Sequence, residues 1–332
     1  MGLNIRGGVN LMEDLSKLKV TALAGGVGAA KFLRGLIEVV PQENVSIIGN
    51  VGDDLTLYGL HISPDLDIVM YTLADLVCKE KGWGIEEDSF NCLNMLSRYG
   101  FDPWFKLGDT DLATHIYRTY LLKSGLTLSQ ATLELCRKLG LKIRLIPVTD
   151  DYLRTVIYSD AGRLTFQEYF VKMKCEPKVL GIVFEGAEEA EPSSGVFEAL
   201  EEADVIVLCP SNPILSIGPI LAVKGIRSFL RRSLKPIVAI SPIVAGKALK
   251  GPADKIMLEL GLKPSALTVA EFYRDFLKVF IVDVRDGNLK FEVEQIGIKV
   301  VLTDTIMSSL SKQITLARET LKAALEIHNI NC

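Results

Sequence analysis

The chain has 332 residues, of which 48% are hydrophobic and 23% charged, so it can bury one large core or two ordinary ones. Its formal net charge of −4 excludes the strongly basic surface of an electrostatic nucleic-acid binder. The most apolar stretch, residues 236–246, is shorter than the ~20 residues that a bilayer-spanning helix needs, and no apolar signal segment starts the sequence. We therefore expect a cytoplasmic protein that binds neither nucleic acid nor membranes.

The first predicted elements follow a polar, irregular stretch at residues 1–16, which we interpret as a weakly ordered extension. Val20–Ala24 is a short apolar run that ends in glycines, and Ala29–Val39 has the composition of a helix. Val45–Ile48 is a second apolar run. This order of strand, loop, helix and strand predicts the start of a parallel, doubly wound sheet.

The middle of the chain has a different pattern. From about residue 66 to residue 140 it is mostly helical, and Asp111–Lys123 carries apolar residues at helical spacing. Ser129 is a suitable N-cap for the next helix. We interpret residues 66–140 as a helical subdomain inserted into an α/β core of residues 17–65 and 141–330. The whole of residues 17–330 then forms one domain.

The rest of the chain alternates between strand and helix patterns. Strands are expected at Lys142–Ile146, Arg154–Tyr158, Leu180–Phe184, Val205–Cys209, Ile237–Ile240, Val279–Val282 and Lys299–Leu302. Helices are expected at Gly195–Glu202, Ile226–Arg232, Ala253–Leu260, Val269–Phe276 and Met307–Ile327. The predicted fold class is therefore α/β, a Rossmann-like parallel sheet with an inserted helical subdomain.

A glycine-rich segment lies between the first predicted strand and helix. Gly25, Gly26 and Gly28 allow a tight turn and close approach of the backbone to a phosphate, and the helix that follows presents free N–H groups. Lys31 adds a full positive charge. The segment matches neither the Walker A pattern nor the full dinucleotide fingerprint. A phosphate site is favoured, and the alternative is a tight turn with a solvated lysine.

Four acidic residues follow the second strand. Asp53 and Asp54 come at its carboxyl end, where open α/β sheets bind ligands, and Asp65 and Asp67 follow shortly after. Carboxylates are hard ligands that suit Mg²⁺, which usually takes one or two of them together with substrate phosphates. The alternative is that each aspartate only forms a turn or caps a helix.

Two later segments also carry polar side chains of functional type. In LGDTDLATH, Asp111 and His115 are spaced to share a helix face, although an aspartate-capped helix with an ordinary histidine has the same pattern. In PSNPILSIGP, two prolines and small polar residues predict an ordered loop that can hold a phosphate or a base edge, or a rigid turn without a ligand. A related loop, residues 241–247, follows the next strand, so several loops converge on one edge.

The chain resembles the 2-phospho-L-lactate transferase family of coenzyme F(420) biosynthesis in six segments that occur in the same order. They are GGVGAAKFLRGL, NVGDDLTLYGLHISPDLDIVMYTLAD, KGWGIEEDSFN, LGDTDLATHIYRT, PSNPILSIGPIL and SPIVAGKALKGPADK. They cover the chain from about Lys19 to Asp283. One departure is Thr110, which stands where the family often has arginine, so any role of that arginine is in doubt.

The resemblance implies a Mg²⁺-dependent transferase, often a homodimer. Its donor is a three-carbon acid linked to guanosine diphosphate, in a lactyl or an enolpyruvyl form. Its acceptor is the terminal ribityl hydroxyl of 7,8-didemethyl-8-hydroxy-5-deazariboflavin, and its by-product is GMP. The sequence leaves open which acid the donor carries and the oligomeric state.

Within this scheme, each candidate residue receives a role. The donor phosphates are assigned to Gly25, Gly26, Gly28 and Lys31, and the rest of the guanosine diphosphate to Ser211, Asn212 and Ser216. Asp53 is the first expected Mg²⁺ ligand, and Asp67 is a second ligand or a base near the acceptor hydroxyl. The acceptor side is assigned to Asp67, Lys106, Asp109, Thr114 and His115.

Two other classes of protein remain as alternatives. A related family of nucleotide-sugar-binding regulatory proteins shares a glycine-rich first loop and is not clearly catalytic, but the segments SPDLD and LGDTDLATH argue against it. An NAD-dependent oxidoreductase has only the imperfect glycine-rich segment in its favour.

Overall fold

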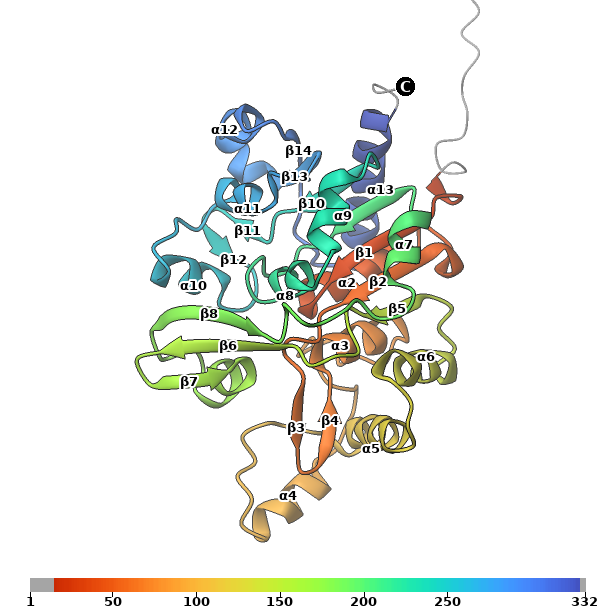
Figure 1. The fold of residues 1–332 in the computed structure, drawn as a ribbon, viewed down its shortest axis with the longest axis vertical. Helices are drawn as coiled ribbons and strands as arrows, with labels where there is room; N and C mark the ends of the chain where they lie inside the picture. The colour runs from red at the N-terminus through yellow and green to blue at the C-terminus, as the bar shows by residue number, and fades with distance from the viewer. Residues whose placement is uncertain (1–14, 329–332) are drawn as a thin grey trace, which may run out of the picture.

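The centre of the molecule is a seven-stranded sheet with strand order β14-β13-β10-β9-β1-β2-β5 (Figure 1). The computed structural model describes residues 15–328, so the extension expected at residues 1–16 lies almost entirely outside the described residues. The strands are β1 (Val20–Ala24), β2 (Val45–Gly49), β5 (Arg144–Pro147), β9 (Val205–Leu208), β10 (Ile237–Ile240), β13 (Val279–Asp283) and β14 (Lys299–Thr303). All neighbouring strands run parallel, so the predicted α/β fold with a parallel sheet is confirmed.

The central strands are continuous apolar runs because both faces of the sheet are covered. Every residue of β1, β9, β10 and β13 is buried, as is typical of a parallel sheet between two helical layers. On one face α2 (Gly26–Leu36) packs against α3 (Pro64–Leu73) and α13 (Leu310–His328). In Figure 1, α7 (Val196–Glu202), α8 (Ile217–Ala222) and α9 (Ile226–Arg232) lie in front of the sheet.

The direction of the connections changes at β1. From β1 the chain passes to β2 on one side, whereas β9, on the other side of β1, leads outward to β10 and β13. The carboxyl ends of β1 and β9 therefore flank a topological switch point, where open α/β sheets bind their ligands. Gly25 directly follows β1 at this point, and Pro210 is two residues after the end of β9.

The segment between β2 and β5 contains α3 and the expected helices. It begins with a short hairpin, β3 (Leu55–Leu57) and β4 (Leu60–Ile62), and continues after α3 with α4 (Asn91–Arg98), α5 (Asp109–Lys123) and α6 (Leu128–Lys138). The hairpin and α4 were not predicted. The predicted N-cap at Ser129 is wrong, because Thr127 caps α6 through a capping box in which its side chain accepts from Gln130 N–H.

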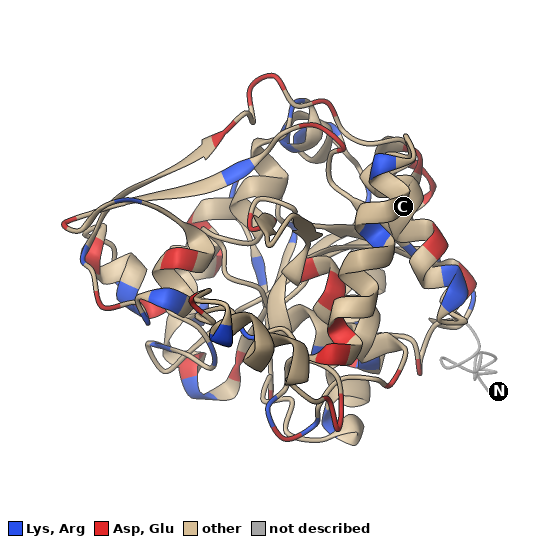
Figure 2. Ribbon diagram, turned by 90° about the horizontal axis from the view of Figure 1, so that it is seen from below, with Lys and Arg blue, Asp and Glu red and all other residues tan. Residues whose placement is uncertain are grey.

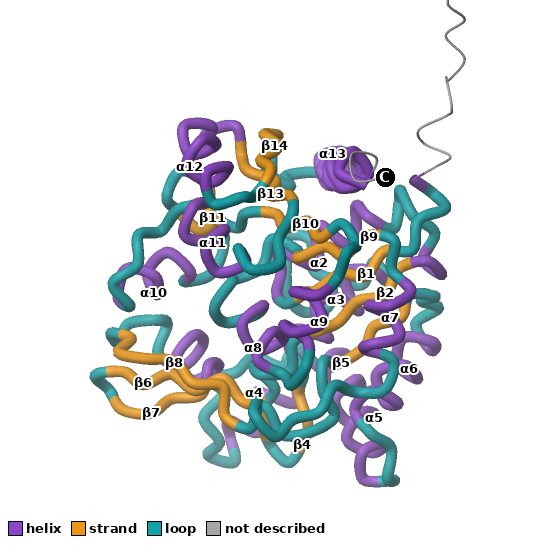
Figure 3. Tube along the Cα trace, turned by 45° about the horizontal axis from the view of Figure 1, so that its top comes forward, coloured by secondary structure: helices purple, strands orange, loops and turns teal. Residues whose placement is uncertain are grey.

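A second, antiparallel sheet lies beside the main one, next to α10 (Figures 1 and 3). Its order is β7-β6-β8, with β6 (Arg154–Ser159), β7 (Gly162–Thr165) and β8 (Val179–Glu185). Two of the predicted strands therefore belong to this sheet instead of the parallel one. It packs on a small separate core that includes Ile157, Tyr169 and Leu215.

The remaining elements are short. They are the hairpin β11 (Ile243–Val244) and β12 (Lys247–Ala248), the helices α10 (Ala253–Glu259), α11 (Ala266–Tyr273) and α12 (Lys290–Gln295), and the turns of other helix type at Gln42–Asn44, Glu168–Lys172 and Val284–Leu289. Acidic and basic residues are interspersed over the whole ribbon in Figure 2. Within residues 15–328, none of the helices has the length and apolar character needed to cross a bilayer.

Candidate active site

The glycine-rich turn at the switch point is tighter than the sequence indicates. Helix α2 already begins at Gly26, whose φ is +74°, so Gly28 and Lys31 lie inside the helix. The N–H of Gly25 donates to Ser211 Oγ at 3.3 Å. A Cβ on Gly25 would stand 2.5 Å from Asp65 Oδ2 and 2.8 Å from Ser216 Cβ. The turn after β1 and the loop after β9 therefore meet. Three residues predicted to bind the donor nucleotide, Gly25, Ser211 and Ser216, come together there.

Gly28 is needed for a different contact. A Cβ at this position would stand 2.3 Å from the backbone oxygen of Pro210, far inside ordinary contact. The glycine therefore lets α2 pack directly on the loop after β9. In the same loop Asn212 Oδ1 accepts from the N–H groups of Ile214 and Leu215, both at 3.0 Å. Asn212 thus fixes the turn that leads into α8, and its amide nitrogen remains as the donor.

Two buried carboxylates follow β2, and one of them, Asp65, lies against the glycine turn. Asp53 and Asp65 are 5% and 8% exposed. Asn50, which the sequence analysis missed, donates to Asp65 Oδ2 at 2.9 Å and accepts from Gly52 N–H at 2.8 Å. Burial raises the pKa of Asp65 to about 6, and burial followed by the charge of Asp65 raises the pKa of Asp53 well above its usual range. Among the described residues Asp53 Oδ1 has no hydrogen-bond partner.

Asp54 points toward the hairpin. Its Oδ2 accepts from Ser63 Oγ at 2.7 Å and lies 2.9 Å from His61 Nε2. Burial raises the pKa of Asp54, and the contacts with His61 and Ser63 act in the opposite direction. Its other oxygen, Oδ1, is buried without a partner in the described part of the chain. A cation at this edge of the sheet would therefore meet carboxylate oxygens that no protein group occupies.

Asp67 has a strong partner that the sequence did not reveal. Arg118 on α5 contacts both carboxylate oxygens, with Nη1 3.2 Å from Oδ2 and Nη2 on Oδ1. Both side chains are buried, and His115 Nδ1 lies 3.7 Å from Asp67 Oδ2. A carboxylate held on two oxygens by a guanidinium is poorly placed to bind Mg²⁺ as well. The geometry thus favours a positioning role for Asp67 over the expected ligand role.

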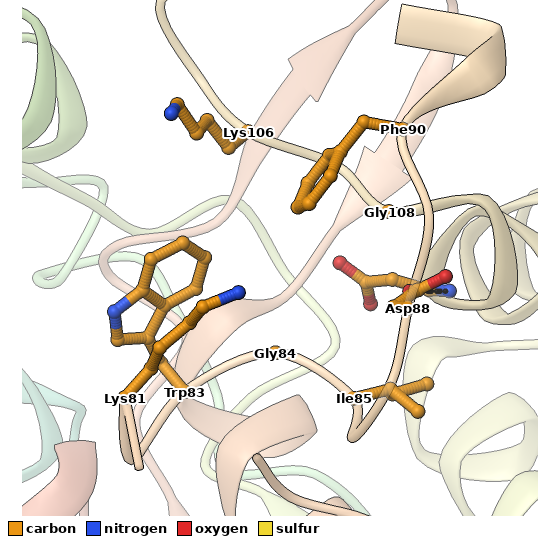
Figure 4. A pocket seen from close by; sticks show the side chains of 9 residues that line it. Lys81, Trp83, Gly84, Ile85, Asp88, Phe90, Lys106 and Gly108 are labelled. Carbon is orange, nitrogen blue, oxygen red and sulfur yellow. Dashed lines mark hydrogen bonds between the residues drawn. The ribbon is translucent and has the colours of Figure 1, made fainter.

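A pocket in the inserted segment carries aromatic and charged side chains (Figure 4). Its walls include Lys81, Trp83, Asp88, Phe90, Lys106 and Asp111. Figure 4 shows the rings of Trp83 and Phe90 on two sides, and the Lys81 ammonium lies 5.8 Å and 5.7 Å from their centres. Lys106 is the one predicted acceptor residue among the pocket's lining residues.

The other predicted acceptor residues lie elsewhere. Asp109 caps α4, because it accepts from Ser89 Oγ at 2.6 Å and from the N–H groups of Asn91 and Cys92 at 2.9 Å. The hydrogen bond from Ser89, followed by that from Cys92 N–H, lowers the pKa of Asp109 to about 2.

Thr114 and His115 follow Asp111, which lines the pocket, on helix α5. His115 is buried and its Nε2 lies 3.2 Å from Asp111 Oδ1. Tyr71 from α3 donates a hydrogen bond to the same oxygen at 2.7 Å. This hydrogen bond joins α3 to α5, and Asp111 lines the pocket.

Comparison with known proteins gives a consistent family. The family model described as 2-phospho-L-lactate transferase CofD matches residues 20–318. The phosphoenolpyruvate transferase of Streptomyces griseus subsp. griseus is 41% identical, over 93% of this chain and 99% of that protein. The 2-phospho-L-lactate transferase of Methanopyrus kandleri is also 41% identical, with the same two shares. That of Methanosarcina acetivorans is 40% identical, over 89% of this chain and 95% of that protein.

Among solved structures, a member of the UPF0052 family from Bacillus halodurans has the same fold. Its TM-score is 0.59, and the match covers 91% of this chain and 98% of that one. At 16% identity this likeness concerns the fold alone. The family model and the relatives extend over nearly the whole chain, including the switch point and the pocket. The chain therefore belongs to the 2-phospho-L-lactate transferase CofD family and is a transferase.

Proposed function

We propose that this enzyme transfers a phospholactyl or phosphoenolpyruvyl group from a guanosine-diphosphate-linked donor to the ribityl hydroxyl of 7,8-didemethyl-8-hydroxy-5-deazariboflavin, with release of GMP, in coenzyme F(420) biosynthesis. The observation that carries the proposal is the pair of buried carboxylates Asp53 and Asp65, of which Asp65 packs against the glycine turn of α2. Its relatives named phosphoenolpyruvate transferase and 2-phospho-L-lactate transferase support the two forms of the transferred group. We further propose a cytoplasmic homodimer.

The reaction is a displacement at phosphorus. The hydroxyl oxygen of the acceptor attacks the phosphorus that carries the three-carbon acid, and a new O–P bond forms. The bond from this phosphorus to the bridging oxygen breaks, and its electron pair leaves with GMP. The hydroxyl proton passes to a base or to solvent, and nothing is oxidised or reduced. Such transfers depend mostly on positioning and on stabilisation of negative charge.

Mg²⁺ fits the carboxylates at the switch point. Within residues 15–328 no three His, Cys, Asp or Glu side chains form a complete metal site, but Mg²⁺ typically needs only one or two carboxylates besides substrate phosphates. Asp53 and Asp65 are buried, and Asp53 Oδ1 is unpartnered, so these two residues would hold the ion. When bound, Mg²⁺ supplies positive charge that neutralises the phosphoryl oxygens.

The chain's own groups around this position can orient the donor. The N–H groups at the start of α2 and the side chains of Ser211 and Ser216 offer donors to phosphate oxygens. Arg118 keeps Asp67 fixed, and Asp67 and Asp65 are on the same helix, α3. We therefore assign Asp67 to positioning, and the expectation that it binds Mg²⁺ or acts as base stays untested.

The pocket of Figure 4 supports the expected place of the acceptor. Trp83, Phe90 and Lys106 offer the aromatic and polar groups that a tricyclic ring needs, but the cavity between them measures only about 10 Å³, so Lys81 and its neighbours must move before a ring can enter. The pocket lies on the segment that continues from α3, the helix that carries Asp65.

A direct assay tests the proposal. The purified protein is incubated with the deazaflavin, Mg²⁺ and either the lactyl or the enolpyruvyl donor, and the products are analysed by mass spectrometry. We expect the phospholactyl or phosphoenolpyruvyl deazaflavin together with GMP. A protein that makes neither product, and that UDP-N-acetylglucosamine stabilises against heat while GDP does not, would instead be a regulatory nucleotide-sugar binder.

A further inference from the structure

Two lysines near the switch point lack a carboxylate partner. Lys31 is on α2, and Lys250 is in the loop that follows β12. In the described part of the chain neither ammonium has an ion pair or a hydrogen bond. The neighbouring Lys247, by contrast, pairs with Asp254 at 3.2 Å. The loop therefore presents one lysine that is neutralised within the protein and one that is not.

The positive charge of Lys250 acts on the ammonium group of Lys31. Burial is the main cause of a lowered pKa at Lys31, and the charge of Lys250 is the second. A pair of like charges without a counter-ion destabilises the free protein, and an anion between them removes the repulsion. A ligand anion that binds here is therefore favoured by both charges.

The position of Lys250 relates the pair to both substrates. Its Nζ lies 2.9 Å from where a Cβ on Gly82 would stand, and Val27 Cγ1 lies 3.8 Å from the same point. Gly82 is in the segment that carries Lys81 and Trp83 of the pocket, whereas Val27 is in the first turn of α2. Side chains on a helix tilt toward its N-terminus, so Lys31 leans back toward this turn. The pair thus lies between the expected donor and acceptor positions.

We propose that Lys31, which the sequence assigned to the donor phosphates, instead binds the carboxylate of the three-carbon acid together with Lys250 while the acid passes from donor to acceptor. The inference rests on the proposed function and names the part of the donor that these lysines recognise. The diphosphate already has Mg²⁺ and the N–H groups of the glycine turn on the side of Asp53 and Asp65. The carboxylate is the remaining anionic group of the donor, and two ammonium groups can each donate to one of its oxygens.

Comparison of the donor with GDP separates this role from diphosphate binding, because GDP lacks the three-carbon acid. Lys250→Met removes the charge and keeps most of the side-chain volume, and Lys247→Met is the matched control in the same loop. For Lys250→Met we expect the donor KM to rise about 10-fold to 100-fold, the range given by one charged hydrogen bond, with an unchanged Kd for GDP. Lys247→Met is expected to match the wild type in both. Calorimetry gives Kd, and thermal melting confirms that both variants fold.

Other results would overturn the inference. Equal weakening of donor and GDP in Lys250→Met would place Lys250 on the diphosphate, and no change in either would remove it from the site. Phosphoenolpyruvate alone provides a second probe: calorimetry is expected to show binding to the wild type that Lys250→Met weakens, and equal or absent binding by both contradicts the inference. If the proposed function itself is wrong, the result is different: the wild type forms no product from either donor.

Discussion

Replacement of Gly28 by alanine tests whether the close approach of α2 to the loop after β9 is needed for activity. The Cβ would stand 2.3 Å from Pro210 O, whereas ordinary contact begins at 3.4 Å, so helix or loop must move by about 1 Å. The obstacle is a backbone oxygen, which no side-chain rotation relieves. The hydrogen bond from Gly25 N–H to Ser211 Oγ is already 3.3 Å long, and a shift of that size breaks it.

The expected effect on stability is small and the effect on catalysis large. Overpacking typically costs about 1–3 kcal/mol, but alanine is favoured over glycine inside a helix by about 1 kcal/mol, so the net loss is at most about 2 kcal/mol. A misplacement of about 1 Å near reacting groups costs on the order of 100-fold in rate. We therefore expect kcat/KM to fall by about that factor while the protein remains folded.

Steady-state product formation and urea unfolding give the two quantities for the same variant. Gly181→Ala is the matched control, because a Cβ on Gly181, in β8, meets nothing within 4 Å and its φ is ordinary. Wild-type kcat/KM in Gly28→Ala would refute the reasoning. A stability loss without a kinetic loss would limit Gly28 to packing.

Three further predictions concern the buried charges. Asp53→Asn should lower kcat by about 100-fold or more, as loss of a key electrostatic group does. The melting temperature should not fall, because the carboxylate that the asparagine replaces is costly to bury. Normal turnover at ordinary Mg²⁺ concentration would contradict this prediction. Arg118→Met should lower the free energy of unfolding, measured in urea, by about 3–5 kcal/mol, because Asp67 is left buried and unpaired. Adding Asp67→Asn should recover part of this loss. If the losses of the two single variants simply add, the pair is not coupled. Because the pKa of Asp65 is raised to about 6 in the fold, its protonated form is favoured, so its contribution to stability is full below about pH 4 and is lost as pH rises through 6. In the absence of Mg²⁺, Asp65→Asn should remove this loss of stability, which is on the order of 3 kcal/mol. If the stability of the variant depends on pH as that of the wild type does, Asp65 is not the cause.

The sequence predicts best those parts of the fold whose signal is local. The strands β1, β9 and β10 are continuous apolar runs because helices cover both faces, and α9 has its predicted bounds. The hairpin of β3 and β4 was missed because its strands have only three residues each. Strands β6 and β8 were predicted, but a short run contains no information on which sheet it joins.

In the candidate site, too, the sequence predicts features with a local signal and misses contacts between distant residues. The glycine turn and the aspartates after β2 could be singled out from the sequence because glycines and carboxylates at the end of a predicted strand are a local signal. The partner of Asp67 was not, because Arg118 is 51 residues away and matches no motif. The capping contacts of Asp109 were not predicted either, since they depend on α4, a helix that begins 18 residues earlier in the sequence. Contacts of this kind depend on the tertiary arrangement.

The position of helix α3 has a consequence for how the binding of one proposed substrate affects the binding of the other. Asp65, near its start, lies against the glycine turn, and two residues later Asp67 is held by Arg118 of α5, while Tyr71 reaches Asp111 at the pocket wall. A single helix thus contacts the surroundings of both proposed substrate sites. Any shift of α3 that accompanies occupation of one site changes the affinity of the other by the same factor in both directions. The two substrates are therefore expected to bind with reciprocal cooperativity, transmitted by ten residues, Pro64–Leu73.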